Sequence, residues 1–218
     1  MLDVKLVSST LDSLDLIESA ASICYDSKPT KKHAIMIDCI ENGHTSVTEY
    51  ANFVFEVKGV SRALLAQITR HRVGVSFTVR SQRYCDEDKF NYVTPPSVLK
   101  DQDAIKKYDT VMETILSAYN DLKYLGVPKE DARYILPNAC ETTFYVQFNL
   151  RSFMHFCNER LCTIAQWEIR KLVNDMVKLI LDKYPELQPY LVPKCEQYKI
   201  PFCSEKRGCG KHPNLTQI

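Results

Sequence analysis

The sequence lacks long hydrophobic runs, and its charges nearly cancel. No more than four apolar residues occur in succession in the 218 residues, so no segment is suited to span a bilayer. The 28 basic and 27 acidic residues leave a net charge of +1, which argues against a protein that coats nucleic acid or an anionic membrane. Only 6 glycines occur, and none forms the Gly-x-Gly-x-x-Gly fingerprint of dinucleotide-binding folds.

The opening stretch "MLDVKLVSST" does not have the pattern of a secretory signal, so none is expected. Its nine cysteines are an odd number and are scattered, which predicts reduced, mostly buried thiols in a cytoplasmic protein. The length and the hydrophobic content of 45% predict a single domain over residues 1–218, with an irregular Cys- and Pro-rich tail from about residue 185.

Helical and alternating patterns are mixed along the chain without the regular order of βαβ units. Strands are expected at 50–60, 75–79 and 141–150, and helices at 9–25, 31–42, 62–72, 105–125, 129–136 and 151–184, the last interrupted around 157–163. The expected fold class is therefore α+β, with an antiparallel-rich sheet packed against long helices.

Carboxylates are absent from one long stretch, the 29 residues from Val57 to Cys85. Five of the ten arginines lie between Arg62 and Arg83. Because like charges repel, these arginines need an anion or carboxylates from elsewhere in the fold. Arginine presents planar, two-pronged donors that suit phosphate, carboxylate or the carbonyl edge of a pyrimidine.

Two interpretations of this arginine cluster are open from composition. One is a solvated basic surface. The other is a phosphate pocket, which is favoured because small or neutral hydrogen-bonding residues stand between apolar neighbours, namely Gly74, Ser76, Ser81 and Gln82. The cluster therefore predicts a phosphate-bearing ligand.

Four short motifs follow one another along the chain. They are "GHTSVTEY" at 43–50, "RHR" at 70–72 followed after eight residues by "SQRY", "RYILP" at 133–137, and "NLRSFMHFCNERLCTIAQWEI" at 149–169. Each motif alone is weakly specific. In this order and spacing, over about residues 40–170, they resemble the flavin-dependent thymidylate synthases.

The resemblance implies a cytosolic homotetramer whose active sites are shared between subunits. It implies reductive methylation of dUMP to dTMP, with 5,10-methylenetetrahydrofolate as carbon donor, FAD as cofactor and NADPH as reductant. The flavin carries the difficult chemistry in such an enzyme, and no thiol or hydroxyl of the protein has to add to the pyrimidine ring.

The resemblance also assigns roles by position. The FAD-binding residues would be His44, Ser46, Arg70, His71, Arg72, Asn149, Arg151 and His155, with Glu49 lining or bracing the same pocket. The dUMP-binding residues would be Gln67, Arg70, Arg80, Ser81, Gln82, Arg83, Arg133 and Arg160. Arg160 is the expected catalytic residue, because a guanidinium at N3 and O2 of the uracil would stabilise the charge that develops there.

Other functions remain open. Ser81 could be a nucleophile, although no base neighbours it, and Cys85 could attack the pyrimidine, although a small buried thiol is the simpler interpretation. A related flavin enzyme could add a hydroxymethyl group or use another pyrimidine nucleotide. A non-catalytic nucleotide- or RNA-binding module is disfavoured by the neutral charge and by the lack of interleaved aromatic residues.

The tail contains residue types that bind zinc, namely Cys195, Cys203, Cys209 and His212. Their spacings of eight, six and three positions include no Cys-x-x-Cys knuckle. The sequence alone therefore predicts no metal site.

Overall fold

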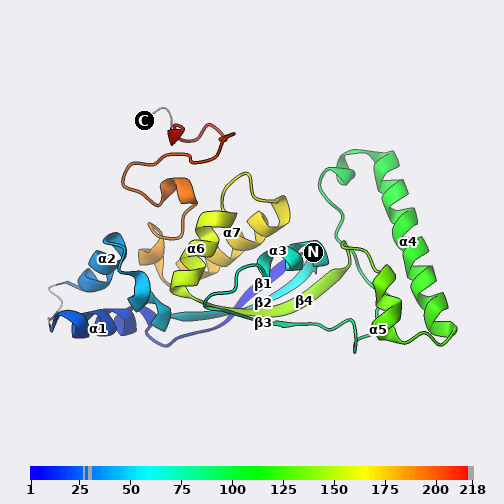
Figure 1. Ribbon diagram of the computed structural model, residues 1–218, viewed down its shortest axis with the longest axis horizontal. Helices are drawn as coiled ribbons and strands as arrows, with labels where there is room; N and C mark the ends of the chain where they lie inside the picture. Colours follow the sequence, from blue (N-terminus) through cyan, green and yellow to red (C-terminus); the bar gives the residue numbers. More distant parts are fainter. Residues whose placement is uncertain (27, 29–30, 216–218) are drawn as a thin grey trace. The chain divides into compact units, whose positions relative to one another are not determined.

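The computed structural model of the chain describes residues 1–26, 28 and 31–215 (Figure 1). The strands are β1 (Asp3–Ser9), β2 (Asn52–Ser61), β3 (Val75–Val79) and β4 (Glu141–Asn149). The α-helices are α1 (Ser13–Tyr25), α2 (Ala34–Glu41), α3 (Arg62–Ile68), α4 (Gln102–Tyr124), α5 (Lys129–Ala132), α6 (Leu150–Arg160) and α7 (Trp167–Leu181). Short 3₁₀ helices are η1 (Thr45–Tyr50), η2 (Val98–Lys100), η3 (Arg133–Ile135), η4 (Pro185–Leu187) and η5 (Lys194–Glu196).

The four strands form one sheet in the order β1-β2-β4-β3. Beyond the end of β2, the Arg62 N–H donates to the carbonyl of Cys140, which precedes β4; at the opposite ends, the Leu150 N–H donates to Ala51. This crossed pairing makes the central strands antiparallel. Alternate residues of β2 and β4 are buried, as the alternating pattern predicts. The α+β fold with an antiparallel sheet is confirmed.

Contacts between residues divide the chain into two compact units. The first unit comprises Met1–Asp3, Val57–Arg70 and Thr78–Tyr145, and the second comprises Val4–Glu56, His71–Phe77 and Val146–Ile218. The division passes through strands β2, β3 and β4, so each unit contains one end of each of these strands.

Aromatic packing builds the core of the second unit. Phe153 of α6 is fully buried and stacks on Phe55 of β2, with 5.8 Å between the ring centroids. Phe156, one turn further along α6, stacks on Phe148 of β4 at 5.0 Å. Figure 1 shows α6 and α7 over the second unit's part of the sheet. This packing fixes the face that α6 turns away from the sheet.

The core of the first unit lies between α4 and the start of β4. Phe90, Met112 and Cys140 form its buried cluster, against which Tyr92 and Tyr108 pack. Figure 1 shows α4 and the short α5 side by side. Helix α4 spans Gln102–Tyr124, which confirms the long helix expected from the apolar spacing of residues 105–122.

Several expectations need correction. Strand β1 was not expected, although Val4 and Leu6 alternate with the exposed Asp3 and Lys5; the alternation is short and its apolar face is only half-buried at the edge of the sheet. Helix α3 ends at Ile68 and not at residue 72; the Thr69 hydroxyl donates to the Leu65 carbonyl at this end. Only four of the nine free cysteines are buried, so the expectation of mostly buried thiols is wrong.

Within the described residues, no helix is both long and apolar enough to cross a membrane.

Candidate active site

The residues expected at the flavin and at the nucleotide fall largely into different units. Seven of the eight expected FAD-binding residues lie in the second unit, all but Arg70. Seven of the eight expected dUMP-binding residues lie in the first unit, all but Arg160.

In the second unit, the turn after the "RHR" motif is held against the first turn of α6. Asn149 donates its backbone N–H to the Gly74 carbonyl at 3.0 Å, and Ser152 donates its hydroxyl to the Val73 carbonyl at 2.6 Å. The Asn149 side chain caps α6 by accepting the Ser152 N–H at 2.9 Å. Gly74 has φ +63, and a Cβ there would lie 2.4 Å from both Asn149 Nδ2 and Ser152 Oγ. Only glycine fits this position.

His71, the middle residue of the "RHR" motif, packs against the side of α6. Its ring meets Phe156 edge-on at 4.9 Å and lies 6.0 Å from the His155 ring. Arg160, at the end of α6, donates its Nε–H to His71 Nε2 at 3.1 Å. Because a guanidinium can only donate, His71 Nε2 must be the accepting nitrogen, which assigns the ring as the neutral Nδ1–H tautomer.

A cavity of about 570 Å³ lies beside α6 in this unit. Of the eight expected flavin residues, Arg151 and His155 line it, and the other six do not. Thr45, between the exposed residues His44 and Ser46, also lines it, and η1 packs against α6. The volume is in the range of sites that hold a cofactor or a drug-sized ligand, and the cation and imidazole of Arg151 and His155 suit an anionic cofactor such as a flavin. Arg151 donates to the Glu49 carboxylate at 2.6 Å.

In the first unit, two of the expected nucleotide arginines meet at one residue. Arg83 donates its Nε–H to the Glu130 carboxylate at 2.6 Å, and Arg133 donates its Nε–H to the Glu130 backbone carbonyl at 3.0 Å. The Arg83–Glu130 pair is about half exposed on both sides. Exposed ion pairs of this kind contribute little to stability, so an incoming phosphate could replace the carboxylate at low cost.

The residues around Arg83 form a tight local turn. Ser81 Oγ accepts the Arg83 backbone N–H at 3.2 Å, and Gln82 donates its amide to Cys140 Sγ at 3.5 Å. Burial raises the pKa of the Cys140 thiol to about 11, so this sulfur stays protonated. Gln67 is half-buried in the last turn of α3, and Arg70 is exposed two residues beyond that helix.

Arg80 is differently placed from Arg83. Its guanidinium pairs with the buried Glu87 and donates to the Asp86 carbonyl at 2.8 Å. Burial raises the pKa of Glu87, partly offset by Arg80, and burial lowers the pKa of Arg62. Arg62 Nε is buried without a hydrogen-bond partner among the described residues. Arg80 therefore forms an ion pair inside the protein, and the carboxylate of Glu87 also acts on the nearby charge of Arg62.

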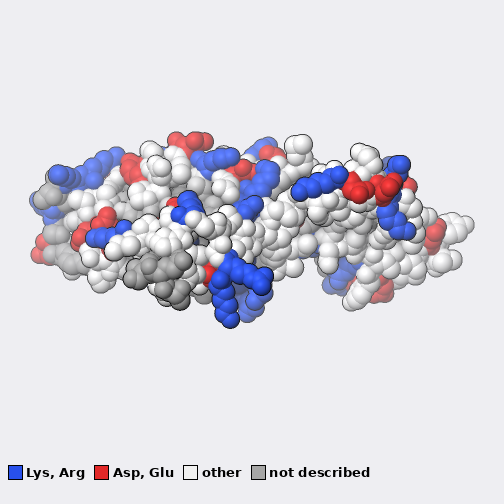
Figure 2. All heavy atoms as spheres, turned by 90° about the horizontal axis from the view of Figure 1, so that it is seen from above, with Lys and Arg blue, Asp and Glu red and all other residues white. Residues whose placement is uncertain are grey.

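Sequence reasoning missed Arg62, Glu87 and Glu130 as members of this electrostatic network. Arg62 was visible as the first arginine of the cluster, and Glu87 follows closely after the carboxylate-free stretch. No local signal marks Glu130, since it lies 47 positions from Arg83. Figure 2 shows basic and acidic side chains interspersed over the face it draws, which is how a chain with a local excess of arginine remains nearly neutral.

Comparison with known proteins identifies the family. The family model described as "Thymidylate synthase complementing protein" matches residues 5–186, which include every residue of both expected sets. The flavin-dependent thymidylate synthase of Nitratidesulfovibrio vulgaris is 35% identical over 96% of this chain and 95% of its own length. The chain belongs to the flavin-dependent thymidylate synthase family. Membership makes it an enzyme and confirms the resemblance found in the motifs.

Other relatives cover the chain equally well. The flavin-dependent thymidylate synthase of Clostridium tetani is 34% identical over 99% of this chain and 96% of its own length. The enzyme of that name from Pyrococcus furiosus is 36% identical over 97% of this chain and 94% of its own length. The similarity therefore extends along nearly the whole chain and beyond the four motifs.

The close approach at Gly74 can be tested by comparing two glycines. Both Gly74 and Gly43 have positive φ, but a Cβ at Gly43 would meet nothing within 4 Å. We expect Gly43→Ala to cost about 1–2 kcal/mol from backbone strain alone. Gly74→Ala should cost clearly more, because Asn149 or Ser152 must also move. Urea unfolding of both variants measures the difference, and equal losses would contradict the close approach.

Proposed function

We propose that the enzyme converts dUMP to dTMP by reductive methylation, with 5,10-methylenetetrahydrofolate as carbon donor, FAD as cofactor and NADPH as reductant. The observation that carries the proposal is the family match, because it spans both sets of site residues. We further propose that the enzyme acts in the cytoplasm as a homotetramer whose active sites are shared between subunits.

The second unit would hold the flavin. Arg72 of the "RHR" motif and Arg151 in the first turn of α6 are exposed cations. His155 lines the same cavity as Arg151. Such cations suit the pyrophosphate of FAD. Bound FAD, once reduced by NADPH, would supply the hydride that completes the methyl group. The residues of the chain bind and orient it.

The first unit would hold the phosphate of dUMP. Arg83 and Arg133 converge on Glu130 and present two guanidinium groups that suit a dianion. Ser81 and Gln82 add neutral hydrogen-bonding groups beside them. In this proposal Arg80 supports the site from within, because Glu87 already occupies its guanidinium.

Arg160 would act on the pyrimidine. Its Nε–H is held by His71, which orients the guanidinium plane and leaves the two terminal amino groups to face a ligand. At N3 and O2 of the uracil, these donors would stabilise the negative charge that makes C5 nucleophilic. His71, as a neutral acceptor, is a positioning residue for Arg160.

The reaction itself is tested by incubating the protein anaerobically with dUMP, methylenetetrahydrofolate, FAD and NADPH. We expect dTMP, identified by mass, together with release of tritium from 5-tritiated dUMP. A product heavier by one oxygen would instead indicate a hydroxymethylase. Binding of dUMP without turnover, in folded and flavin-loaded protein, would indicate a binding module and contradict the proposal.

Arg160→Ala should impair chemistry more than binding. Removing one preorganised donor to a developing anion typically costs about 10²–10³-fold in rate. Arg160→Lys should restore only part of the rate, because an ammonium lacks the planar fork. Tritium release, dUMP affinity and flavin reduction by NADPH are measured side by side. Weaker dUMP binding with unchanged tritium release would make Arg160 a simple anion-binding residue.

Glu130→Gln should tighten dUMP binding. The change removes a carboxylate that competes with phosphate for Arg83, and exposed pairs are worth about 0.2–1 kcal/mol, which corresponds to an increase of about 1.4- to 5-fold. Asp131→Asn is the matched control, because it removes the same charge from the next residue of α5. Calorimetric titration with dUMP measures both. Weakened binding in Glu130→Gln alone would show that the carboxylate organises the site and does not compete with the ligand.

A further inference from the structure

Four of the nine cysteines line one small cavity of the second unit. They are Cys162, Cys195, Cys203 and Cys209, and His212 lines the cavity with them. The cavity has a volume of about 40 Å³, which is close to the space of a single water molecule and far below that of an organic ligand. Cys162 comes from the connection between α6 and α7, and the other four residues come from the tail.

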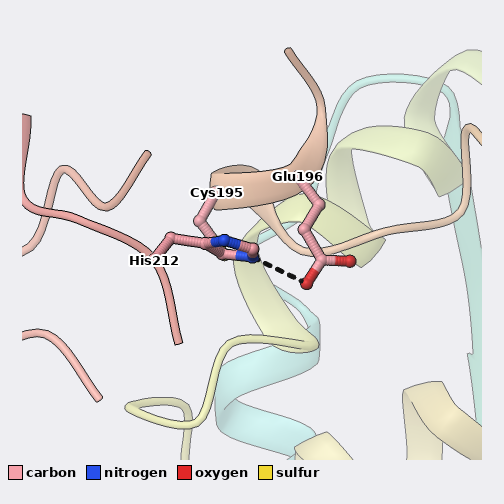
Figure 3. A group of neighbouring side chains, drawn as sticks. All are labelled: Cys195, Glu196 and His212. Carbon is pink, nitrogen blue, oxygen red and sulfur yellow. Dashed lines mark hydrogen bonds and ion pairs between the residues drawn. The ribbon is translucent and has the colours of Figure 1, made fainter. Parts of the chain in front are cut away.

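The donor atoms of Cys195, Glu196 and His212 already lie within 4.8 Å of one another (Figure 3). His212 Nε2 is 3.2 Å from a Glu196 oxygen, and Lys211 pairs with the same carboxylate. When Nε2–H donates to a carboxylate, Nδ1 is the nitrogen that can bind a metal. A carboxylate behind a histidine is the usual outer partner of a zinc ligand.

Cys209 and Cys203 lie at one turn of the tail. Gly208 and Gly210 flank Cys209, and Gly210 has φ +84, a backbone conformation that favours glycine. A Cβ at Gly208 would lie 3.1 Å from Cys203 Sγ, which places Cys203 against the same turn.

We propose that this cluster binds one structural Zn²⁺, through Cys195, His212 and two of the thiols of Cys162, Cys203 and Cys209, with Glu196 as the hydrogen-bond partner of His212. Three thiolates and one imidazole are a common closed, tetrahedral zinc set. Their net charge with Zn²⁺ is −1, and Lys211 offsets the further negative charge of Glu196. Zinc binding would release the protons of the thiols.

The spacing of the tail residues did not predict this zinc site, because neither Cys162 nor Glu196 belongs to a recognisable zinc-binding motif. The match to the family model ends at residue 186, so Cys195, Cys203, Cys209 and His212 lie beyond it. The metal would tie the tail to the connection after α6, which begins immediately after Arg160. The proposal is independent of the reaction, and its test needs no turnover.

The test measures zinc in the full-length protein. The reduced protein is loaded with zinc, freed of excess by gel filtration and analysed by mass spectrometry of the metal. We expect about one zinc per chain in the wild type and about none in Cys195→Ser and His212→Ala. Cys24→Ser is the matched control, because Cys24 is an exposed cysteine of α1, and it should keep the metal. Wild type without zinc, or both variants with full zinc, would overturn the proposal.

A second measurement keeps the test valid if the variants do not fold. Wild-type protein is titrated with an organomercurial in the presence of a coloured zinc indicator, and zinc should be released as three thiols react. X-ray absorption at the zinc edge should give three sulfur ligands and one nitrogen ligand. Release without thiol modification, or a shell of oxygen ligands, would refute the site. A disulfide within the cluster, detected as missing thiols in the unreduced protein, would also refute it.

Discussion

The hydrogen bonds between the turn at residues 73 and 74 and the first turn of α6 determine the geometry of the second unit's site. Asn149 caps the helix and binds the turn, and Ser152 binds the preceding carbonyl. A side chain on Gly74 would collide with both residues, so glycine is needed for the turn to lie this close to α6. The "RHR" motif therefore ends beside α6, where His71 reaches Phe156 and Arg160. The cap of α6, the turn at Gly74 and the guanidinium of Arg160 are thus connected through hydrogen bonds and the short segment from His71 to Gly74.

Electrostatics explains how the arginine cluster is tolerated. The stretch without carboxylates receives them from outside its own residues: Glu87, just after the stretch, pairs with Arg80, and Glu130 pairs with Arg83. Glu49 pairs in the same way with Arg151 of α6. The pairs differ in burial: Glu87 is buried, whereas the Glu130 and Glu49 pairs are about half exposed, and exposed pairs contribute little to stability.

The sequence predicted the elements whose signals are local. The alternation in β2 and β4 and the apolar face of α4 depend on neighbours within a few positions, and both were found. The motifs also predicted the family correctly. Strand β1 and the end of α3 were missed, because the alternation in β1 is short and because the helix pattern continues past the actual end of α3.

Contacts between distant residues could not be predicted in this way. Nothing near Arg83 marks Glu130, and nothing near Cys195 marks Cys162, since both pairings are created by the tertiary fold. The same holds for the distribution of the site residues, because the "RHR" motif itself is divided, with Arg70 in the first unit and His71 and Arg72 in the second.

The central proposal is that most residues that bind the flavin lie in the second unit and that the residues that bind the phosphate of dUMP lie in the first. Hydrogen exchange of the full chain, measured by mass spectrometry with dUMP alone and with FAD alone, tests it most directly. We expect dUMP to slow exchange at residues 80–84 and 129–136, and FAD to slow exchange at 44–50, 71–76 and 149–156. Protection by FAD confined to the first group of segments, or by dUMP confined to the second, would contradict the assignment.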